Sequence, residues 1–376
     1  MKRFAYIDAL RGYAILMVIA VHASQYVEGL PPWMTTIANQ GARGVQLFFV
    51  ASALTLCLSW QARHDGAMAF YLRRLFRIAP MFWLAIIYFV AVDGFGPRGA
   101  YAPDGIGARQ IVAAALFLHG LMPDAITSVV PGSWSIADEA IFYLIFPLLF
   151  AINKRLRIIY AFLAAIIISC GCIWIDHLTA SFASRIPGVD MEMWAAFIFL
   201  WFPSQLPAFL AGMLVFKVGE RVNLSPATGA IIVLASIAVF ASVTLLPDQH
   251  YINAFRLSLF AAAFFLLALG LKYWQPATLV NPVIGWVGKV SYSAYFLHFA
   301  ILEAVAMPSG LSASSLLNYA LTFLTLTIAT IAAASITYLA IERPIIGWGA
   351  RVIARIASND ERRHQALEEA PAPRRS

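Results

Sequence analysis

Three ionisable side chains, Asp8, Arg11 and His22, lie within the first long apolar stretch of the sequence. An α-helix advances about 100° per residue, so spacings of three and eleven bring all three close to one face, with His22 about 16 Å beyond Arg11. Titratable groups are costly to bury in a membrane, and those found there usually face a bundle interior or a water-filled cavity. We therefore predict one polar stripe on this helix that serves as a functional site.

The composition indicates the class of protein that carries this stripe. Of the 376 residues, 61% are hydrophobic and 12% are charged, and the apolar residues form long blocks between short polar segments. This pattern predicts an all-α polytopic membrane protein. The net charge of +7 is concentrated in short loops and the C-terminal tail, which indicates membrane orientation rather than a nucleic-acid partner. The three cysteines lie in apolar blocks without metal-ligand spacing, so we expect inert thiols and no metal site.

Ten apolar blocks are long enough to cross a membrane as helices. They are residues 7–27, 44–60, 78–92, 136–152, 156–175, 194–216, 227–246, 254–271, 290–307 and 316–341. An eleventh block, 110–121, is shorter and carries His119. Short loops rich in Lys and Arg stay in the cytoplasm, and all such clusters fall on that side only if the eleventh block does not cross. We predict ten crossings, one short re-entrant or buried helix, and both termini in the cytoplasm.

The two ends of the chain lead to separate expectations. Lys2 and Arg3 followed by an apolar core resemble a signal peptide, but the charges in that core favour an uncleaved first helix. Residues 1–357 form the predicted membrane domain, and residues 358–376 have too few apolar side chains to fold, which predicts a disordered cytoplasmic tail. We expect no soluble catalytic domain fused at either end.

The sixth crossing is expected to be interrupted. Pro203 and Pro207 remove two backbone donors in mid-span. Such a break is tolerated where the backbone faces protein or lines a cavity. A break of this kind is compatible with a substrate path.

Three arginines, Arg73, Arg74 and Arg77, precede the third crossing. Plain anchoring on the cytoplasmic side explains such a cluster about as well as a function does. However, Arg74 and Arg77 are three residues apart and share a helical face, which suits a fork that grips phosphates. A cytoplasmic ligand that carries phosphates is the functional interpretation.

The segment 131–143 opens the fourth crossing from the outer side. Ser133 and Ser135 are suitable helix caps, and the helix dipole favours an acid in the first turn. Two consecutive acids, Asp138 and Glu139, exceed what a cap requires. We predict that Glu139 lies near the outer mouth and orients or charge-balances a catalytic imidazole.

The ninth crossing also carries polar side chains, including Tyr292 and His298. Tyrosine and serine at a membrane interface are ordinary, and an isolated intramembrane histidine is about twice as often structural as functional. That interpretation applies to His298 and to His119. His22 differs because it shares a helical face with two charged groups.

These stretches together resemble the acyltransferase 3 family of membrane-bound O-acyltransferases, without a fused esterase-like domain. The matching motifs are Ile7-Asp-Ala-Leu-Arg-Gly followed by His22, Gly44-Val-Gln-Leu-Phe-Phe-Val-Ala-Ser52, the Arg-Arg-x-x-Arg-Ile-x-Pro run, Gly132-Ser-Trp-Ser-Ile-x-x-Glu139-x-x-Phe-Tyr, Ser291-Tyr-Ser-x-Tyr-x-Leu-His298 and Ile341-Glu-Arg-Pro344. The resemblance spans nearly the whole chain. It implies ten membrane helices with both termini inside, and transfer of an acyl group, usually acetyl, from cytoplasmic acyl-CoA to a carbohydrate hydroxyl at or beyond the outer face of a bacterial inner membrane.

The resemblance also implies roles for individual residues. His22 matches the essential histidine of the first helix and Arg11 its partner arginine. Arg74 and Arg77 match the basic motif after the second helix, and Glu139 the acidic position of the Ser-Trp-Ser motif. Three positions depart from the family pattern, with Ala53 in place of Gly, Gln205 in place of Arg and Ala208 in place of Glu. They put the identity of the acceptor in doubt.

The mechanism we expect joins two half-paths at His22. Arg74 and Arg77, with Arg73 and Arg11, pair with the phosphates of acyl-CoA, the co-substrate, and no cofactor is permanently bound. A neutral imidazole takes the proton of a sugar hydroxyl, such as one of an O-antigen or exopolysaccharide, as it attacks the thioester. Further candidates for contact with substrate or oxyanion are Asp8, Ser52, Ser133, Trp134, Tyr292 and His298, of which Ser52 and Tyr292 are the expected oxyanion donors.

Two alternatives stay open. One is a covalent acyl-histidine relay on the same residues. The other is a transporter or flippase of an acylated or sugar-linked lipid, because an intramembrane arginine, a broken helix and a histidine can equally mark a substrate path. The acceptor sugar, the acyl group and the oligomeric state are left open by the sequence.

Overall fold

The computed structural model describes residues 4–63, 65–98, 101–247, 250–305 and 314–368, and these residues form helices and connecting turns without a β-strand. The elements are α1 (Ala5–Gln25), α2 (Pro32–Asn39), η1 (Gln40–Arg43), α3 (Gly44–Ala62), α4 (Gly66–Asp93), α5 (Ala108–Ala115), η3 (His119–Leu121), α6 (Trp134–Arg155), α7 (Ile158–Ala183), α8 (Met191–Leu200), α9 (Phe202–Arg221), α10 (Pro226–Thr244), α11 (His250–Tyr273), α12 (Pro282–Val305), α13 (Ser315–Thr337), the π-helical turn η4 (Tyr338–Glu342) and α14 (Arg343–Glu368).

Nine helical stretches in the described residues are long and apolar enough to cross a membrane. The predicted crossing 290–307 is not among these nine. It corresponds to α12, which at 24 residues is about 36 Å long but carries lysine, serine, tyrosine and histidine side chains. Many of these side chains are buried, which indicates that α12 faces protein rather than lipid. The predicted class, an all-α multi-pass membrane protein, is confirmed.

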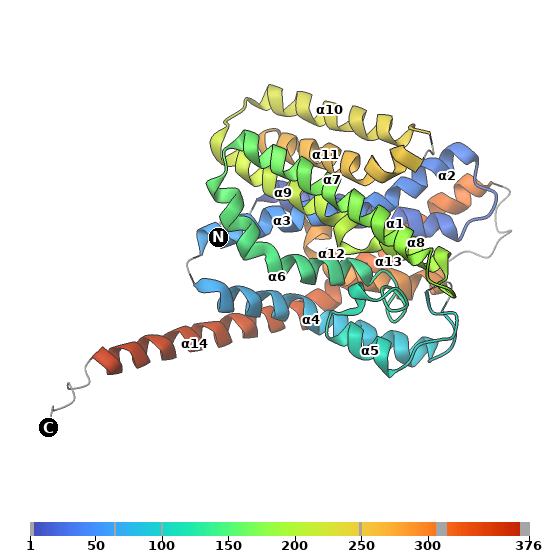
Figure 1. Cartoon of the computed structure of the whole chain (residues 1–376). Coiled ribbons are helices and arrows are strands. Elements are labelled where there is room, and N and C mark those ends of the chain that lie inside the picture. Colours follow the sequence, from blue (N-terminus) through green and yellow to red (C-terminus); the bar gives the residue numbers. More distant parts are fainter. Residues whose placement is uncertain (1–3, 64, 99–100, 248–249, 306–313, 369–376) are drawn as a thin grey trace.

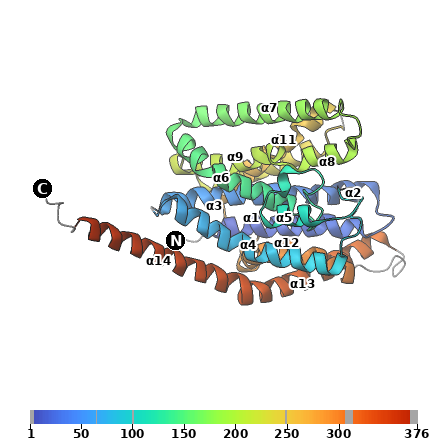
Figure 2. The ribbon, with the colours of Figure 1, turned by 60° about the horizontal axis from the view of Figure 1, so that its bottom comes forward.

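The helices run roughly along one common direction, with different elements at the two ends of the bundle. Helix α1 begins, and α14 projects, at one end, whereas α2 and α5 lie at the opposite end (Figures 1 and 2). Helices α2 and α5, which belong to segments that we expect on the outer side of the membrane, thus lie at the same end of the bundle. That α14 projects into the cytoplasm stays a prediction.

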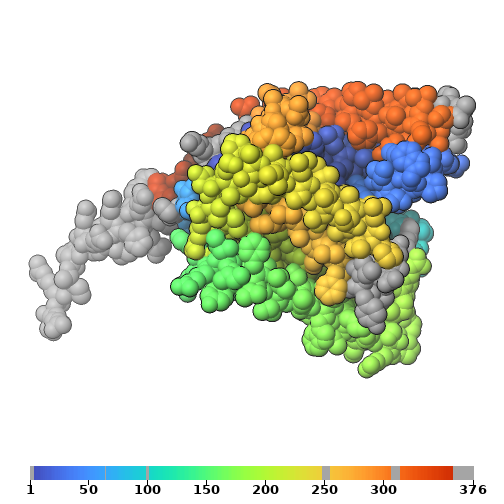
Figure 3. Space-filling view, turned by 90° about the horizontal axis from the view of Figure 1, so that it is seen from above, coloured from blue at the N-terminus to red at the C-terminus, as the bar shows by residue number. Residues whose placement is uncertain are grey.

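Helices α7 and α10 lie at the periphery of the bundle (Figure 3). Only 11% of the most apolar window of α7 and 22% of that of α10 are buried. Large aliphatic side chains such as Ile167 and Leu234 are more than 60% exposed. Because lipid tails are as apolar as these side chains, such surfaces are expected to face lipid.

Helices α1 and α12 form the closest backbone contact that bears on the site. A Cβ atom added to Gly288 would lie 1.8 Å from the carbonyl oxygen of Asp8, and one added to Gly12 would lie 2.5 Å from that of Ile284. Small residues at these positions let two membrane helices approach closely. The contact holds the two helices in register along their lengths.

The short block 110–121 does not form a crossing helix. Helix α5 has eight residues, which gives about 12 Å, and the chain then turns through η3. His119 is fully buried, and its Nε2 lies 3.0 Å from the carbonyl oxygen of Ser133. The block therefore packs against the start of α6, in agreement with the predicted buried helix.

The sixth crossing breaks earlier than we predicted. Helix α8 ends at Leu200 and α9 begins at Phe202, with Trp201 extended between them. Pro203 is in the first turn of α9, where no backbone donor is needed, and Pro207 is accommodated inside α9. At the C-terminus, α14 continues to Glu368, past the end of the predicted membrane domain, and residues 369–376 lie outside the described part.

Candidate active site

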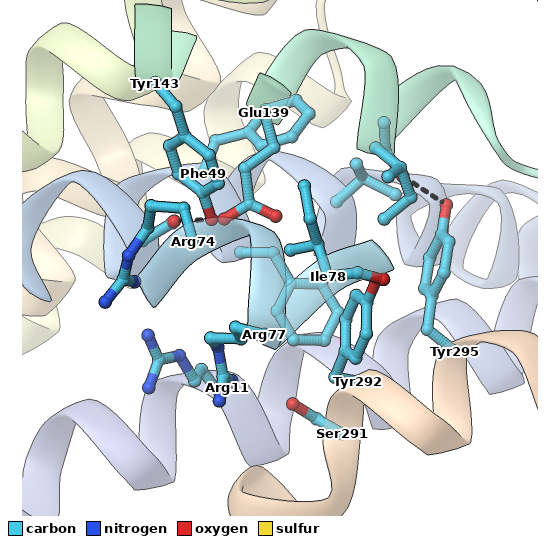
Figure 4. A pocket seen from close by; sticks show the side chains of 15 residues that line it. Arg11, Phe49, Arg74, Arg77, Ile78, Glu139, Tyr143, Ser291, Tyr292 and Tyr295 are labelled. Atoms are coloured by element: carbon cyan, nitrogen blue, oxygen red, sulfur yellow. Dashed lines mark hydrogen bonds between the residues drawn. The ribbon is translucent and has the colours of Figure 1, made fainter. Parts of the chain in front are cut away.

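A polar cavity lies between α1, α3, α4, α6 and α12, and we call it the arginine cavity. Its lining includes three arginines, Arg11, Arg74 and Arg77, together with hydroxyl groups and aromatic rings. The rest of the described lining consists of Val45, Phe48, Phe49, Ser52, Ile78, Ser135, Ile136, Glu139, Tyr143, Ser291, Tyr292 and Tyr295. Figure 4 shows the three guanidinium groups gathered on one side, with Tyr295 on the other. The free volume is about 70 Å³, which makes the cavity narrow.

Each arginine in the cavity is held by a different partner. Arg11 Nη2 donates a hydrogen bond of 3.1 Å to Thr55 Oγ1. The Arg74 guanidinium lies over the ring of Tyr143, 5.9 Å from its centroid. Arg77 Nη1 lies 3.6 Å from Glu342 Oε1. The three arginines thus face two carboxylates, Glu139 in the lining and Glu342 beside Arg77, and the remaining positive charge suits an anionic ligand.

Glu139 is the carboxylate of this lining, and it faces the arginines. Ser52 Oγ donates a hydrogen bond to Glu139 Oε1. The negative charge of Glu139 attracts the guanidinium groups of Arg11, Arg74 and Arg77. The expectation that Glu139 orients a histidine is not met in this arrangement, because Glu139 accepts from the Ser52 hydroxyl and lines the arginine cavity, whereas His22 lies outside that lining.

His22 lies apart from the cavity, at the other end of α1. It is not part of the described lining, and α1 is one continuous helix, so the eleven residues from Arg11 span about 16 Å. His22 Nδ1 lies 3.0 Å from Gln25 Oε1. Its ring centroid is 5.3 Å from that of His298 and 4.5 Å from that of Phe299. The single stripe that we predicted is therefore two regions.

His298 completes a histidine pair with His22. It is fully buried, and its Nδ1 lies 3.2 Å from the carbonyl oxygen of Ala294. Its Nε2 is buried and has no hydrogen-bond partner among the described residues. A buried nitrogen without a partner is costly, so this one needs a functional explanation or an ordered water. The sequence favoured a structural role for this residue.

Tyr295 connects the cavity to the histidine pair. Its ring lines the cavity and lies 5.8 Å from the ring of His298. Its hydroxyl donates to the carbonyl oxygen of Gly132 at 2.9 Å and accepts from Ser135 Oγ at 2.9 Å. Gly132 has φ +73°, and an added Cβ would lie 2.9 Å from the Tyr295 hydroxyl. Glycine is therefore required where the Ser-Trp-Ser motif meets this tyrosine.

Three other predicted site residues, Asp8, Arg73 and Tyr292, either lie outside the cavity lining or use their polar groups in contacts with the protein. Asp8 is not in the described lining, and its backbone packs on α12. Arg73 pairs with Asp65 in a separate cleft. The Tyr292 hydroxyl donates to the carbonyl oxygen of Ile78.

The Ser-Trp-Ser motif plays a structural part at the start of α6. Ser133 is at the cap position, but its hydroxyl donates to the carbonyl oxygen of Ile126 at 3.3 Å rather than capping α6. The Trp134 ring meets the Phe49 ring edge to face at 6.1 Å. Neither side chain contacts His22 in the described interactions.

Sequence reasoning missed three residues that shape the cavity. Tyr143 and Tyr295 were seen only as parts of motifs. Glu342 was also missed, although it is a buried acid at the end of an apolar run and lies in a π-helical turn, a feature often found at functional sites. Glu342 Oε2 accepts a hydrogen bond of 2.9 Å from Ser293, which fixes it against Arg77.

The departure from the family pattern at Gln205 also has a structural counterpart. Gln46 Nε2 donates to Gln205 Oε1 at 3.3 Å, and Gln205 Nε2 donates to the carbonyl oxygen of Phe199 at 2.7 Å. Both amides are buried between α3 and α9. Gln205 is outside the described lining of the arginine cavity. In the described residues, no three His, Cys, Asp or Glu side chains gather in a way that could hold a metal ion.

Comparison with known proteins gives consistent similarities. The family described as "Acyltransferase domain" matches residues 4–339. The chain is 25% identical over 340 residues to a candidate O-acetyltransferase of Staphylococcus aureus (strain COL), covering 81% of this chain and 52% of that protein. It is 25% identical over 320 residues to the acyltransferase MdmB of Streptomyces mycarofaciens, covering 80% of this chain and 79% of that protein.

A third relative is named for polysaccharide production. The chain is 26% identical over 333 residues to the exopolysaccharide production protein ExoZ of Rhizobium meliloti (strain 1021), covering 84% of this chain and 94% of that protein. The chain spans about half the length of the Staphylococcus aureus relatives it matches. No solved structure matches the chain at a significant level.

Proposed function

Because the chain belongs to the acyltransferase 3 family, we propose that it transfers an acyl group from acyl-CoA to a hydroxyl of a carbohydrate. Acetyl is the simplest group consistent with the relatives that are named as O-acetyltransferases. The similarity to ExoZ supports a polysaccharide or its lipid-linked precursor as the acceptor. The proposed location is the inner membrane of a bacterium, with the donor on the cytoplasmic side.

The observation that carries this proposal is the arginine cavity. Three guanidinium groups, those of Arg11, Arg74 and Arg77, converge on one narrow space with one carboxylate in the described lining. Guanidinium groups bind phosphates through charge-assisted, often bidentate hydrogen bonds. A neutral sugar needs no such charge, whereas the phosphates of acyl-CoA do. The cavity is therefore the proposed binding site for the donor.

The second half of the proposal concerns the distance to His22. The thioester of acyl-CoA is separated from its phosphates by the long, flexible pantetheine arm. An arm anchored at Arg11 would have to extend about 16 Å along α1 to bring the thioester to His22. Tyr295 and His298 lie along that route.

The proposed chemistry takes place at the free nitrogen of His22. A hydrogen bond from Nδ1 to Gln25 Oε1 would leave Nε2 as a proton acceptor. Nε2 takes the proton of the sugar hydroxyl while the hydroxyl oxygen bonds to the thioester carbonyl carbon. The carbon–sulfur bond then breaks, and the imidazolium returns the proton to the departing thiolate. A covalent acyl-histidine intermediate uses the same residues in two steps.

The test uses the full-length protein in lipid nanodiscs with [¹⁴C]acetyl-CoA. The acceptor probe is the surface polysaccharide of the bacterium that encodes this protein, treated with mild alkali to remove its O-acyl groups. We expect free CoA and labelled polysaccharide to form together in equal amounts, and neither without protein. Movement of a labelled lipid-linked sugar across proteoliposomes without any release of CoA would instead support the transporter alternative.

A further inference from the structure

A second basic site, a cleft, is lined by residues from the end of α3, the start of α4 and the end of α6. These helix ends lie at the end of the bundle from which α14 projects (Figures 1 and 2). The described lining of the cleft includes Trp60, Arg63, Asp65, Arg73, Phe150 and Lys154. The free volume is about 360 Å³, against about 70 Å³ for the arginine cavity. Ligand sites usually enclose about 300–1,000 Å³, so the cleft has the size of a binding site.

We propose that this basic cleft binds the adenine and 3′-phosphate end of acyl-CoA, an inference that rests on the proposed donor. The first reason is space. A buried water needs about 10–15 Å³, so the arginine cavity has room for only a few waters or an extended chain. A purine nucleoside with its own phosphate does not fit there. The bulky end of the donor therefore needs a second, wider place.

The second reason is charge. The cleft contains three cations, Arg63, Arg73 and Lys154, and one carboxylate in its described lining. That carboxylate, Asp65, pairs with Arg73, and no salt bridge is found for Arg63 or Lys154 among the described residues. The Arg73 Nε atom is also buried without a described partner. A phosphate monoester, with its double charge, matches this surplus.

The third reason is the aromatic surface. Trp60 is half-buried in the wall of the cleft, and Phe150 lies beside it with ring centroids 6.4 Å apart. Aromatic rings beside cations provide the stacking surface that nucleic-acid bases use in proteins. Phe150 is buried and supports Trp60 from behind, so the exposed part of the Trp60 ring is the stacking surface for the purine, next to charges for the phosphate.

The fourth reason is that the two sites adjoin. Arg73 lines the cleft and its neighbour Arg74 lines the cavity. The Phe70 ring lies 5.1 Å from the ring of Trp60 and 5.9 Å from the Arg74 guanidinium. One aromatic layer therefore separates the two sites. CoA carries a pyrophosphate and a separate 3′-phosphate, of which the first is assigned to the cavity and the second to the neighbouring cleft.

The experiment compares two donors, acetyl-CoA and acetyl-3′-dephospho-CoA, on the full-length protein in nanodiscs. The variants are Lys154→Gln and Arg63→Gln. Arg155→Gln is the matched control, because Arg155 follows Lys154 in α6, is also exposed and is outside the described lining. The readouts are KM and kcat for each donor, and Kd for CoA and 3′-dephospho-CoA.

We expect each variant to raise KM and Kd about two- to fivefold for the donor with the 3′-phosphate, since the lost contacts are solvent-exposed. The values for the dephospho donor and kcat should stay unchanged, and the control should match the wild type. Equal changes for both donors, or none, would overturn the inference. A wild type that binds CoA without cleaving acetyl-CoA would refute the proposed function, while the difference in Kd would still test the cleft.

Discussion

The arginine cavity and the histidine pair are both built on α1, but their side chains are satisfied in different ways. In the cavity, charged groups meet charged or hydroxyl partners, as in the pairing of Arg77 with Glu342 and of Ser52 with Glu139. At the other end, His22 and His298 lie against each other and against Phe299, and His298 Nε2 has no partner in the described residues. The first region suits binding of an anion, and the second suits transfer of a proton.

This difference shows how α1 can contribute both to anion binding and to proton transfer. Charges at membrane depth need permanent partners, because an unpaired charge is too costly. An uncharged imidazole can remain without a strong partner and so keep a free nitrogen for chemistry. If the two tasks are separate, substitutions in the two regions must affect different kinetic constants.

The largest expected effect is on turnover. Replacing His22 by alanine should lower kcat about 10²- to 10⁴-fold, which is the usual contribution of a general base. Kd for acetyl-CoA, measured by calorimetry, should stay within about twofold because the phosphates bind elsewhere. His177→Ala, at an exposed position in α7, is the control. A His22 variant with normal turnover would end the proposed role.

The next effect is on binding. Arg74→Gln should raise Kd for acetyl-CoA about 10- to 100-fold, because one charge-assisted phosphate contact is lost. Arg74→Lys should recover part of the affinity, since it keeps the charge but not the fork. Arg351→Gln, an exposed position in α14, should change nothing. If Arg74→Gln lowered kcat and left Kd alone, the division of tasks between the two regions would be wrong.

A smaller effect on turnover is expected at the second histidine. His298→Gln should lower kcat about tenfold at unchanged Kd, because the His22 ring packs against His298 and even small misplacement slows a reaction. The variant His298→Phe keeps an aromatic ring but has no ring nitrogen, so its kcat distinguishes the contribution of packing against His22 from that of the nitrogen atoms. Full activity in the phenylalanine variant would show that only packing matters at this position.

The smallest effect on activity is expected at His119, a buried histidine away from both regions. Burial lowers the pKa of His119 to about 4, from about 6.5 in the unfolded chain. Between these values the unfolded state binds more protons, so stability must fall as pH drops from 6.5 to 4, by on the order of 3 kcal/mol. His119→Gln should remove this part of the pH dependence in thermal unfolding without changing kcat at pH 7. An unchanged pH dependence in the variant would rule out the buried, neutral imidazole.

Much of the fold could be predicted from the sequence because hydrophobic blocks of membrane length seldom occur in soluble proteins and must cross a bilayer as helices. The predicted crossing 290–307 differs from the other nine: it corresponds to α12, whose serine, tyrosine and histidine side chains are buried against other helices. This helix is therefore not among the stretches that are apolar enough to cross by composition alone. The short block 110–121 was correctly interpreted from its length and from the condition that the Lys- and Arg-rich loops all lie on one side of the membrane. The position of the helix break at Trp201 was not predicted, because the first turn of a helix tolerates Pro203.

The site could be predicted only in part. Arg11, Arg74 and Arg77 could be grouped because intramembrane or clustered charges need a common ligand or partner. The pairing of His22 with His298 could not, because it depends on the close contact of α1 and α12 at Gly12 and Gly288, far apart in the sequence. Sequence spacing places residues on a helical face, but not beside a given neighbouring helix.

The central claim is that the donor binds at the arginines and reacts at His22. The most direct test is a structure of the full-length protein with a non-hydrolysable acetyl-CoA analogue in which a methylene replaces the thioester sulfur. We predict the pyrophosphate against Arg11, Arg74 and Arg77, and the acyl carbonyl carbon about 4–5 Å from His22 Nε2, which leaves room for the acceptor hydroxyl between them. An acyl group that ends in the arginine cavity beside Glu139, with nothing bound near His22, would contradict the claim.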